Sequence, residues 1–447
     1  MPQPPKRMPL NRSDPARCAD RPPRQGSFVP AGRAAPSVRG GRPVAVVGLL
    51  LLAAVSARAG ERVLPLPTTR PPATSAAAIC LYEPQMGLVM YAKQAEQRRF
   101  PASLTKLMTA LLVLERADPT EQVTVSATAA AVGEASLGLQ AGDVYPMETL
   151  LEGALIKSAN DACAALAEHV AGSQAAFAQL MNARARELGL TTTHFVNCHG
   201  LHDPAHVSSA RDLARLAAAA MQEPEFNRIV AMRRHTFPRP DGSTLELEST
   251  NRLLRSDNGN YWPAADGVKT GWTHPAGRCL VASATANGWR LLCVVLGAKD
   301  PWTDARSLLT WGFEHFARRQ VVTAGETTAA VPVLDGVRPT VPAVAKRSVL
   351  CLIPEGCGVS PPRVAEVLLE APVDPEQEVG ELIVEHPEGG EERVALLATE
   401  AVPRSLLARL RDNLQSFMYG LIGLALIGGA LVHAAVTKAA GARRRRK

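Results

Sequence analysis

The sequence feature that most restricts the fold is an uncharged apolar run near the carboxyl end, F-M-Y-G-L-I-G-L-A-L-I-G-G-A-L-V-H-A-A-V, residues 417–436. In lipid, every backbone N–H and C=O of such a run must be bonded internally, and a helix achieves this. Twenty helical residues span about 30 Å, the thickness of the hydrocarbon core. The run therefore predicts a transmembrane anchor, and a basic cytoplasmic tail over 437–447.

The amino end predicts export of the chain. A basic, proline-rich stretch precedes twelve apolar residues at 44–55, and S-A-R-A-G follows them. Twelve residues are short for a membrane span but suit the apolar centre of a signal peptide. We expect a signal peptide with a long basic n-region over 1–59, with an uncut anchor as the alternative. The catalytic part would then lie on the extracytoplasmic (periplasmic) side of the cell membrane.

The basic charge of the chain is concentrated at its two ends. Of a formal net charge of +7 over 447 residues, residues 1–43 contribute +7 and residues 443–447 contribute +5, which leaves −5 for the body. Basic ends are typical of membrane-targeted chains, whereas a nucleic-acid surface needs basic charge on the folded body. We therefore expect no nucleic-acid partner.

Cysteines and histidines suggest neither a metal site nor a cofactor. Of the eight cysteines, Cys18 lies in the predicted signal peptide, and most of the others lie in apolar runs, which is typical of buried thiols. Cys351 and Cys357 are close enough to pair in an oxidising compartment, and the sequence leaves this open. Four histidines crowd residues 194–206, but their spacing lacks a regular ligand face.

Periodicity along the chain predicts an antiparallel sheet with helices on its faces. After a linker over 60–75 come two short strands, 76–82 and 87–92, and then a run of helices. Two apolar runs around Asn287-Gly288 predict a hairpin with a type I′ turn, residues 266–272 an adjacent strand, and residues 302–318 a closing helix. This pattern predicts an α+β domain over 76–319. Short alternating runs then predict a small all-β domain over 320–402.

One helix start combines a serine and a lysine in F-P-A-S-L-T-K-L-M-T-A, residues 100–110. Ser103 and Lys106 are three residues apart, so they share a helix face. A serine hydroxyl is a weak nucleophile unless a base takes its proton, and a lysine is such a base only when its pKa is lowered. Burial, the helix N-terminus and a second cation would each lower that pKa.

Two further motifs strengthen this interpretation. Ser158-Ala159-Asn160 ends a helical run, and Lys269-Thr270-Gly271 lies on a predicted strand. A serine can relay a proton, and an asparagine amide can hold a substrate amide. A glycine in the strand lets a substrate backbone approach its edge. The order S-x-x-K, S-x-N, K-T-G on helix, loop and strand is the signature of penicillin-recognising serine enzymes.

Longer stretches extend these motifs: F-P-A-S-L-T-K-L-M-T, I-K-S-A-N-D-A, H-G-L-H-D-P-A-H-V-S-S-A-R-D-L-A and D-G-V-K-T-G-W-T-H-P-A-G-R-C-L-V-A-S-A-T. On them, roughly residues 70–415 resemble the D-alanyl-D-alanine carboxypeptidases among the low-molecular-mass penicillin-binding proteins. The resemblance implies a β-lactamase/transpeptidase-like fold. It also implies a serine hydrolase that removes the terminal D-Ala from peptidoglycan pentapeptide stems, with β-lactam antibiotics as covalent inhibitors.

The resemblance also implies roles for individual residues. Ser103 would form the acyl-enzyme, Lys106 would be the general base, and Ser158 would pass the proton to the leaving amine.

The substrate-binding residues implied by the same resemblance surround these groups. They are Asn160 for the substrate amide, Lys269 and Thr270 for the terminal carboxylate, Gly271 at the strand edge, Trp272, whose N–H would join that of Ser103 in the oxyanion hole, and Arg306 as a loosely aligned carboxylate ligand.

Three other functions stay open at this point. A β-lactamase shares the fold and the motifs, but class A enzymes carry a glutamate about 36 residues after S-x-N, where this chain reads T-T-T-H-F-V-N. A DD-endopeptidase that cuts cross-links would use the same residues. A catalytically silent wall-binding protein would not need the serine and both lysines.

Overall fold

The structure is a computed structural model and describes residues 63–444. The predicted signal peptide over 1–59, the first residues of the linker and the end of the basic tail lie outside the described residues.

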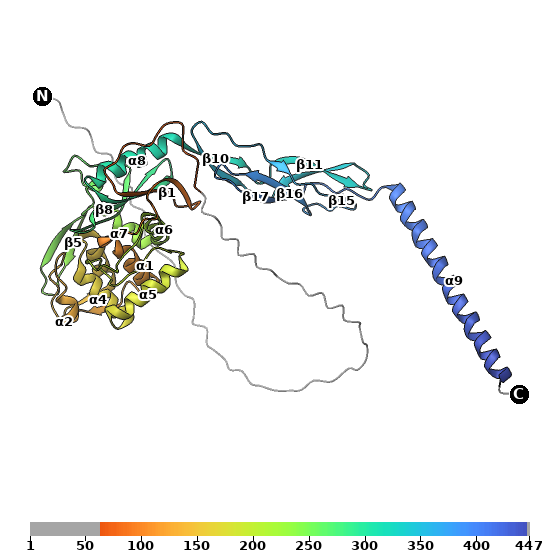
Figure 1. Cartoon of the computed structure of the whole chain (residues 1–447), viewed down its shortest axis with the longest axis horizontal. Helices are drawn as coiled ribbons and strands as arrows, with labels where there is room; N and C mark the ends of the chain where they lie inside the picture. The colour runs from red at the N-terminus through yellow and green to blue at the C-terminus, as the bar shows by residue number, and fades with distance from the viewer. Residues whose placement is uncertain (1–62, 445–447) are drawn as a thin grey trace, which may run out of the picture. The chain divides into compact units, whose positions relative to one another are not determined.

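A five-stranded antiparallel sheet forms the centre of the first domain (Figure 1). Its spatial order is β2-β1-β9-β8-β7, where the strands are β1 (Ala78–Glu83), β2 (Leu88–Lys93), β7 (Ala265–Thr273), β8 (Gly277–Ala286) and β9 (Trp289–Ala298). The β1–β2 hairpin thus pairs with the β8–β9 hairpin, although the run of helices separates them in the sequence. Asn287 and Gly288 have φ of 51° and 73°, as a type I′ turn requires. The predicted α+β architecture is confirmed.

The two faces of the sheet bury different helices. Successive side chains of a strand point to opposite faces, so Cys80 and Val294 join one apolar cluster while Leu81 and Cys293 join another. The second cluster is covered by the long helix α8 (Pro301–His315). The first is covered by the helical layer labelled in Figure 1.

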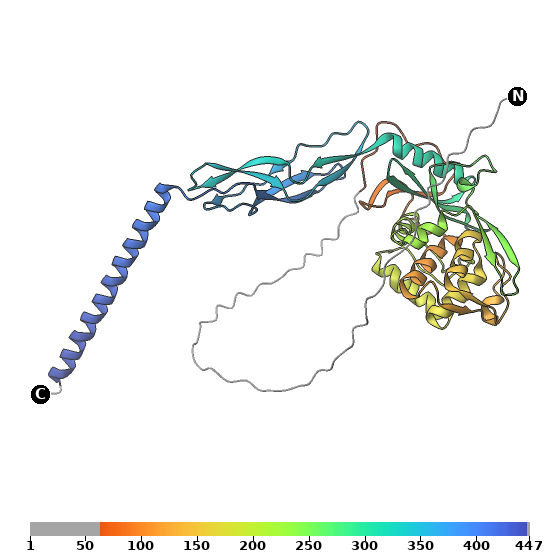
Figure 2. The same cartoon turned by 180° about the vertical axis from the view of Figure 1, so that it is seen from behind.

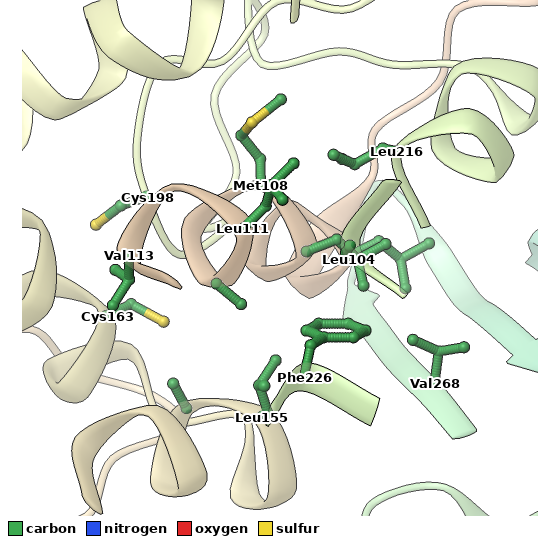
Figure 3. Packing of buried hydrophobic residues seen from close by; sticks show 14 of the residues in the cluster. Leu104, Met108, Leu111, Val113, Leu155, Cys163, Cys198, Leu216, Phe226 and Val268 are labelled. Carbon is green, nitrogen blue, oxygen red and sulfur yellow. The ribbon is translucent and has the colours of Figure 1, made fainter. Parts of the chain in front are cut away.

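The helical layer supplies the first half of the site. It contains η1 (Ala102–Thr105), α1 (Lys106–Arg116), α2 (Ala127–Ala130), α3 (Met147–Glu152), η2 (Gly153–Lys157), α4 (Asn160–Ala171), α5 (Gln174–Glu187), α6 (Ala210–Ala220) and α7 (Pro224–Val230). The short η3 (Arg252–Leu254) instead packs Leu253 into the second cluster. Figure 3 shows α1 at the centre of the cluster, with Leu104, Met108 and Leu111 packed among Leu155, Phe226 and Val268.

Two small hairpins complete this domain. They are β3 (Gln122–Thr124) with β4 (Val144–Pro146), and β5 (Arg234–Pro238) with β6 (Thr244–Glu248).

The segment after α8 is all-β (Figure 2). A six-stranded sheet has the order β14-β16-β17-β12-β11-β15, and a two-stranded sheet joins β10 to β13. The strands are β10 (Phe316–Val322), β11 (Thr327–Leu334), β12 (Thr340–Ala345), β13 (Val349–Pro354), β14 (Arg363–Val364), β15 (Leu369–Glu370), β16 (Glu378–Glu385) and β17 (Glu391–Ala398). The sequence left open whether Cys351 and Cys357 form a disulfide, and both are free thiols in the structure.

The last element is α9 (Leu406–Arg444). Its stretch Leu406–Lys438 is long and apolar enough to cross a membrane, and its most apolar part is not buried in protein, although Ala408 near its start is. The helix begins before the predicted span of 417–436. Its first turns carry Leu407, Leu410 and Leu414 together with Arg409 and Arg411, an amphipathic start to an otherwise apolar helix.

Candidate active site

The candidate nucleophile lies on a tight turn at the entrance of α1. Ser103 is in the single 3₁₀ turn η1, and the preceding Ala102 has φ of 49°, in the left-handed region. A non-glycine residue in that region costs free energy and persists only where the surroundings hold it. Gly200 packs directly on this turn, because a Cβ there would overlap the Ala102 carbonyl and come within 2.9 Å of the Ser103 nitrogen.

Lys106 is placed to act as a base. Its side chain is 1% exposed, and its Nζ lies 3.1 Å from Ser103 Oγ, 2.7 Å from Asn160 Oδ1 and 2.6 Å from the His199 carbonyl oxygen. A neutral amine has two N–H groups and one lone pair. The two carbonyl-type acceptors can take the two N–H groups, which leaves the lone pair for the hydroxyl proton of Ser103.

Electrostatics favour the neutral form of Lys106. Burial lowers its pKa, because a charged ammonium loses its hydration there, while surrounding thiols and carboxylates oppose the shift only partly. Lys269 is fully buried as well, and burial followed by the nearby charge of Lys106 holds its pKa well below the ordinary range. Two buried amines this close disfavour carrying two charges at once.

Asn160 and Ser158 come from a distorted helix junction. The predicted helix over 148–157 ends in a single π-helical turn, η2, and Ser158 follows it with φ of 69° and ψ of 32°. Such turns and left-handed residues are frequent at functional sites. Asn160 then begins α4 and donates to the Gly133 carbonyl at 3.0 Å while it accepts from Lys106.

A loop over 133–139 closes this side of the site. Buried Asp161, next to Asn160, accepts hydrogen bonds from the backbone N–H groups of Leu137 and Leu139 and from the hydroxyl of Ser136. The backbone N–H of Asn160 donates to the Ala135 carbonyl at 2.6 Å. Sequence reasoning missed this support, since no motif marks the loop.

The K-T-G strand forms the opposite wall. β7 is the last strand of its sheet, so its outer edge is free to pair with an extended peptide. A Cβ on Gly271 would come within 3.0 Å of the Pro101 carbonyl oxygen and 3.1 Å of the Ser103 nitrogen, tighter than a Cβ normally packs, so glycine lets the strand pass close to Ser103 without displacing this turn. Thr270 Oγ1 donates to Thr250 Oγ1 at 2.6 Å.

These walls enclose a cavity of about 520 Å³. Six of the predicted site residues line it: Ser103, Ser158, Asn160, Thr270, Gly271 and Trp272. Trp272 is 63% exposed, so its ring faces solvent at the rim.

Arg306 does not line this cavity. It borders a second cavity, and Arg278 on β8 lines the first in its place. Glu134, Gly200 and Thr250, which sequence reasoning missed, line the first cavity as well, and so does Trp302. The H-G-L-H stretch, already matched to the family, was the signal that pointed to Gly200.

Within residues 63–444, no group of three or more His, Cys, Asp or Glu side chains could hold a metal ion, so the four crowded histidines form no such group there. His206 Nδ1 accepts from the backbone N–H of Val196 at 3.0 Å, so its proton is on Nε2, which lies 2.7 Å from Thr105 Oγ1. Burial lowers the pKa of His206 to about 4 and that of His199 to about 3, so both are neutral at pH 7. These rings support the η1–α1 entrance.

Comparison with known proteins agrees with this geometry. The peptidase S11 family model, described as D-alanyl-D-alanine carboxypeptidase, matches residues 67–300. The chain is 41% identical to D-alanyl-D-alanine carboxypeptidase DacC of Escherichia coli K12 over 282 residues, which cover 60% of this chain and 67% of that protein. It is 30% identical to DacF of Bacillus subtilis 168 over 354 residues, 76% and 88% of the two chains.

A solved structure gives the same result. Penicillin-binding protein 5 of Haemophilus influenzae aligns with a TM-score of 0.61 at 29% identity, covering 75% of this chain and all of that one. With Ser103, the buried lysines and the edge strand arranged at one site, this chain belongs to the D-alanyl-D-alanine carboxypeptidase family of penicillin-binding serine hydrolases.

Proposed function

We propose that Ser103 attacks the carbonyl carbon of the penultimate D-Ala of a pentapeptide stem while Lys106 takes its proton. The observation that carries this role is the contact between the buried Lys106 Nζ and Ser103 Oγ. The backbone N–H groups of Ser103 and Trp272 stabilise the oxyanion. Ser158 passes the proton to the leaving amine, D-Ala departs, and water hydrolyses the ester of Ser103.

The binding residues orient the stem along the edge of β7. Asn160 holds the substrate amide, and Lys269 and Thr270 bind the terminal carboxylate at the far end of the scissile bond. Arg278 lines the same cavity and can take the part first assigned to Arg306. The stem backbone pairs with the free edge of the strand beside Gly271.

We further propose that the chain is anchored by α9 with its hydrolase domain on the extracytoplasmic side. The apolar helix supports the anchor, and the family's peptidoglycan substrate supports the orientation. Residues 443–447 would then stay in the cytoplasm.

Mass spectrometry tests the reaction and the nucleophile together. The full chain is expected to shorten a pentapeptide by one D-Ala, and a penicillin adduct is expected on the peptide that contains Ser103. Ser103→Ala should lose both. D-Ala release by Ser103→Ala would place the active site elsewhere, and rapid turnover of the penicillin adduct would identify a β-lactamase.

A further inference from the structure

One acidic side chain lines the catalytic cavity, and the proposed reaction does not use it. Among the described residues that line this cavity, Glu134 is the only acidic one. Its side chain is exposed and, within residues 63–444, takes part in no ion pair or hydrogen bond. Glu148 and Glu225 of the same domain, by contrast, both pair with Arg228. The carboxylate of Glu134 is therefore available to a ligand.

The backbone holds Glu134 in a conformation that is costly for a residue with a side chain. Its φ is 67°, in the left-handed region, where a non-glycine residue persists only if its surroundings fix it. Asn160 fixes both neighbours of Glu134. Its Nδ2 donates to the Gly133 carbonyl at 3.0 Å, and its backbone N–H donates to the Ala135 carbonyl at 2.6 Å. A glycine would adopt this conformation at lower cost, so what the glutamate adds is its carboxylate.

The contacts of Asn160 also indicate on which side of the scissile bond Glu134 lies. In the proposed function, Asn160 holds the amide between the third stem residue and the penultimate D-Ala, whereas Thr270 binds the terminal carboxylate on the opposite wall. Because both neighbours of Glu134 are bonded to Asn160, Glu134 lies beside the third stem residue. A side chain of four carbons on that residue extends about 5–6 Å, far enough to reach the carboxylate of Glu134.

The charges on this side of the cavity indicate the kind of ligand. Lys157, which directly precedes Ser158, lines the cavity as well. Its side chain is exposed and takes part in no ion pair or hydrogen bond in the described part of the chain. A carboxylate binds an amine that carries a proton, and a lysine binds a carboxylate. One group of each sign therefore suits a ligand that carries both signs at its end, as the amine and carboxylate of an amino-acid head group do.

We propose that Glu134 and Lys157 select stems whose third residue ends in an amino-acid head group, as diaminopimelate does. Glu134 binds the amine of that head group and Lys157 binds its carboxylate. This inference rests on the proposed function and names the third residue that the same site prefers. Both side chains contact the stem away from the reacting atoms, so they determine specificity and act mainly through KM.

The test compares three pentapeptides that differ only at the third residue, which is diaminopimelate, lysine or Nε-acetyl-lysine. The wild-type chain is expected to rank them in this order, with kcat/KM falling about two- to fivefold at each step, as exposed charge pairs allow. Glu134→Gln should bring the lysine peptide down to the level of the acetyl-lysine peptide. Lys157→Gln should bring the diaminopimelate peptide down to the level of the lysine peptide. High salt should weaken both preferences, because it screens exposed charges.

Two further variants separate the charge of Glu134 from its structural effect. Glu134→Gly suits the φ of 67° and removes the carboxylate, so it should lose the preference for the lysine peptide while the chain stays folded. Glu134→Lys should reverse that preference, because it repels the amine. The matched control is Glu246→Gln, which changes an exposed glutamate of β6 that does not line the catalytic cavity and should keep the wild-type ranking.

Equal wild-type kcat/KM for the lysine and acetyl-lysine peptides would overturn the role of Glu134. An equal loss on all three peptides in Glu134→Gln would overturn it too, and would indicate an effect on Lys106 or on the water that hydrolyses the ester. A preference for diaminopimelate that survives in Lys157→Gln would overturn the role of Lys157. A wild-type chain that hydrolyses none of the peptides would refute the proposed function. Calorimetric binding of the same peptides to Ser103→Ala, with and without Glu134→Gln, would then still decide on the selection.

Discussion

At the scale of single residues, the site depends on Lys106 being able to lose its proton. Lys106→Arg keeps a long cationic side chain but replaces an amine whose pKa is lowered by burial with a guanidinium that stays protonated. We expect acylation by a labelled penicillin to slow by a factor of about 10²–10⁴, the usual contribution of a general base. Stopped-flow acylation measures the change. Retention of the wild-type rate would show that another group takes the proton.

Gly200 provides a second test at this scale. Its φ of +89° and its contact with Ala102 make Gly200→Ala both strained and overlapping, so we expect loss of acylation and a lower free energy of unfolding. Gly172→Ala is the matched control, because Gly172 has φ of +74° but nothing within 4 Å. The control should cost only the backbone penalty, about 1–2 kcal/mol. Equal effects of the two variants on acylation would contradict the packing role of Gly200.

The buried histidines predict a pH dependence of stability. His206 has a folded pKa of about 4, below the ordinary 6.5, so the native state resists its protonation while the unfolded chain accepts the proton. The free energy of unfolding should therefore fall as the pH drops from about 6.5 to 4, by up to about 1.4 kcal/mol per pH unit for this group. The free energy of unfolding, measured by denaturant titration, should therefore fall less steeply with pH over this range in His206→Gln than in wild type. An equal pH dependence of the free energy of unfolding in the two proteins would contradict this role of His206.

At the scale of elements, Asp161 holds the loop over 133–139 against the start of α4. Asp161→Asn keeps the shape but points an amide at backbone N–H donors, so we expect a loss of about 1–3 kcal/mol of stability. A lower kcat/KM for pentapeptide should accompany it, since Glu134 and Ala135 line the cavity. Exposed Asp241→Asn is the control, because within residues 63–444 the Asp241 side chain is hydrogen-bonded only to Ser243. A stable but inactive Asp161→Asn would indicate a direct role in substrate contact.

The elements also show how far the sequence alone could go. Strands β8 and β9 were predictable because alternation and the Asn-Gly turn are local signals, and the helix from Ala102 was predictable from its apolar stripe. The π-helical turn η2 was not, because its five residues G-A-L-I-K continue a helical pattern and only packing distorts them. The β5–β6 hairpin was missed because its strands are mostly exposed and carry charge.

The residues of the site also divide into those that the sequence could predict and those that it could not. Ser103, Asn160 and Thr270 belong to three motifs of local spacing. The resemblance to the family, and not that spacing, implied that they share one site, and all three line the same cavity. Arg306 borders a different cavity from Ser103, and the sequence could not predict this because no local pattern indicates which cavity a helix face borders. Arg278 reaches the catalytic cavity only through the pairing of β8 with β7 opposite Trp272, a contact that depends on the folded register.

At the scale of the whole chain, the proposed catalytic site and the proposed membrane anchor use separate residues. The residues that line the catalytic cavity all lie between Ser103 and Trp302, whereas the apolar surface that needs lipid lies in α9. Leu421, Leu424 and Leu431 of α9 are exposed, and in water each would leave apolar area uncovered. We therefore expect a chain that ends before Leu406 to move from the membrane fraction to the soluble fraction.

Such a truncated chain should keep its kcat/KM for a soluble pentapeptide within about twofold, because no site residue is removed. Its activity on membrane-bound precursor should fall more, since the anchor no longer concentrates the enzyme at the surface. Fractionation with parallel assays on both substrates measures this, and a full-length chain with leucines of α9 changed to alanine separates apolarity from length. A truncated chain that stays in the membrane fraction would show that a segment before Leu406 also anchors the protein.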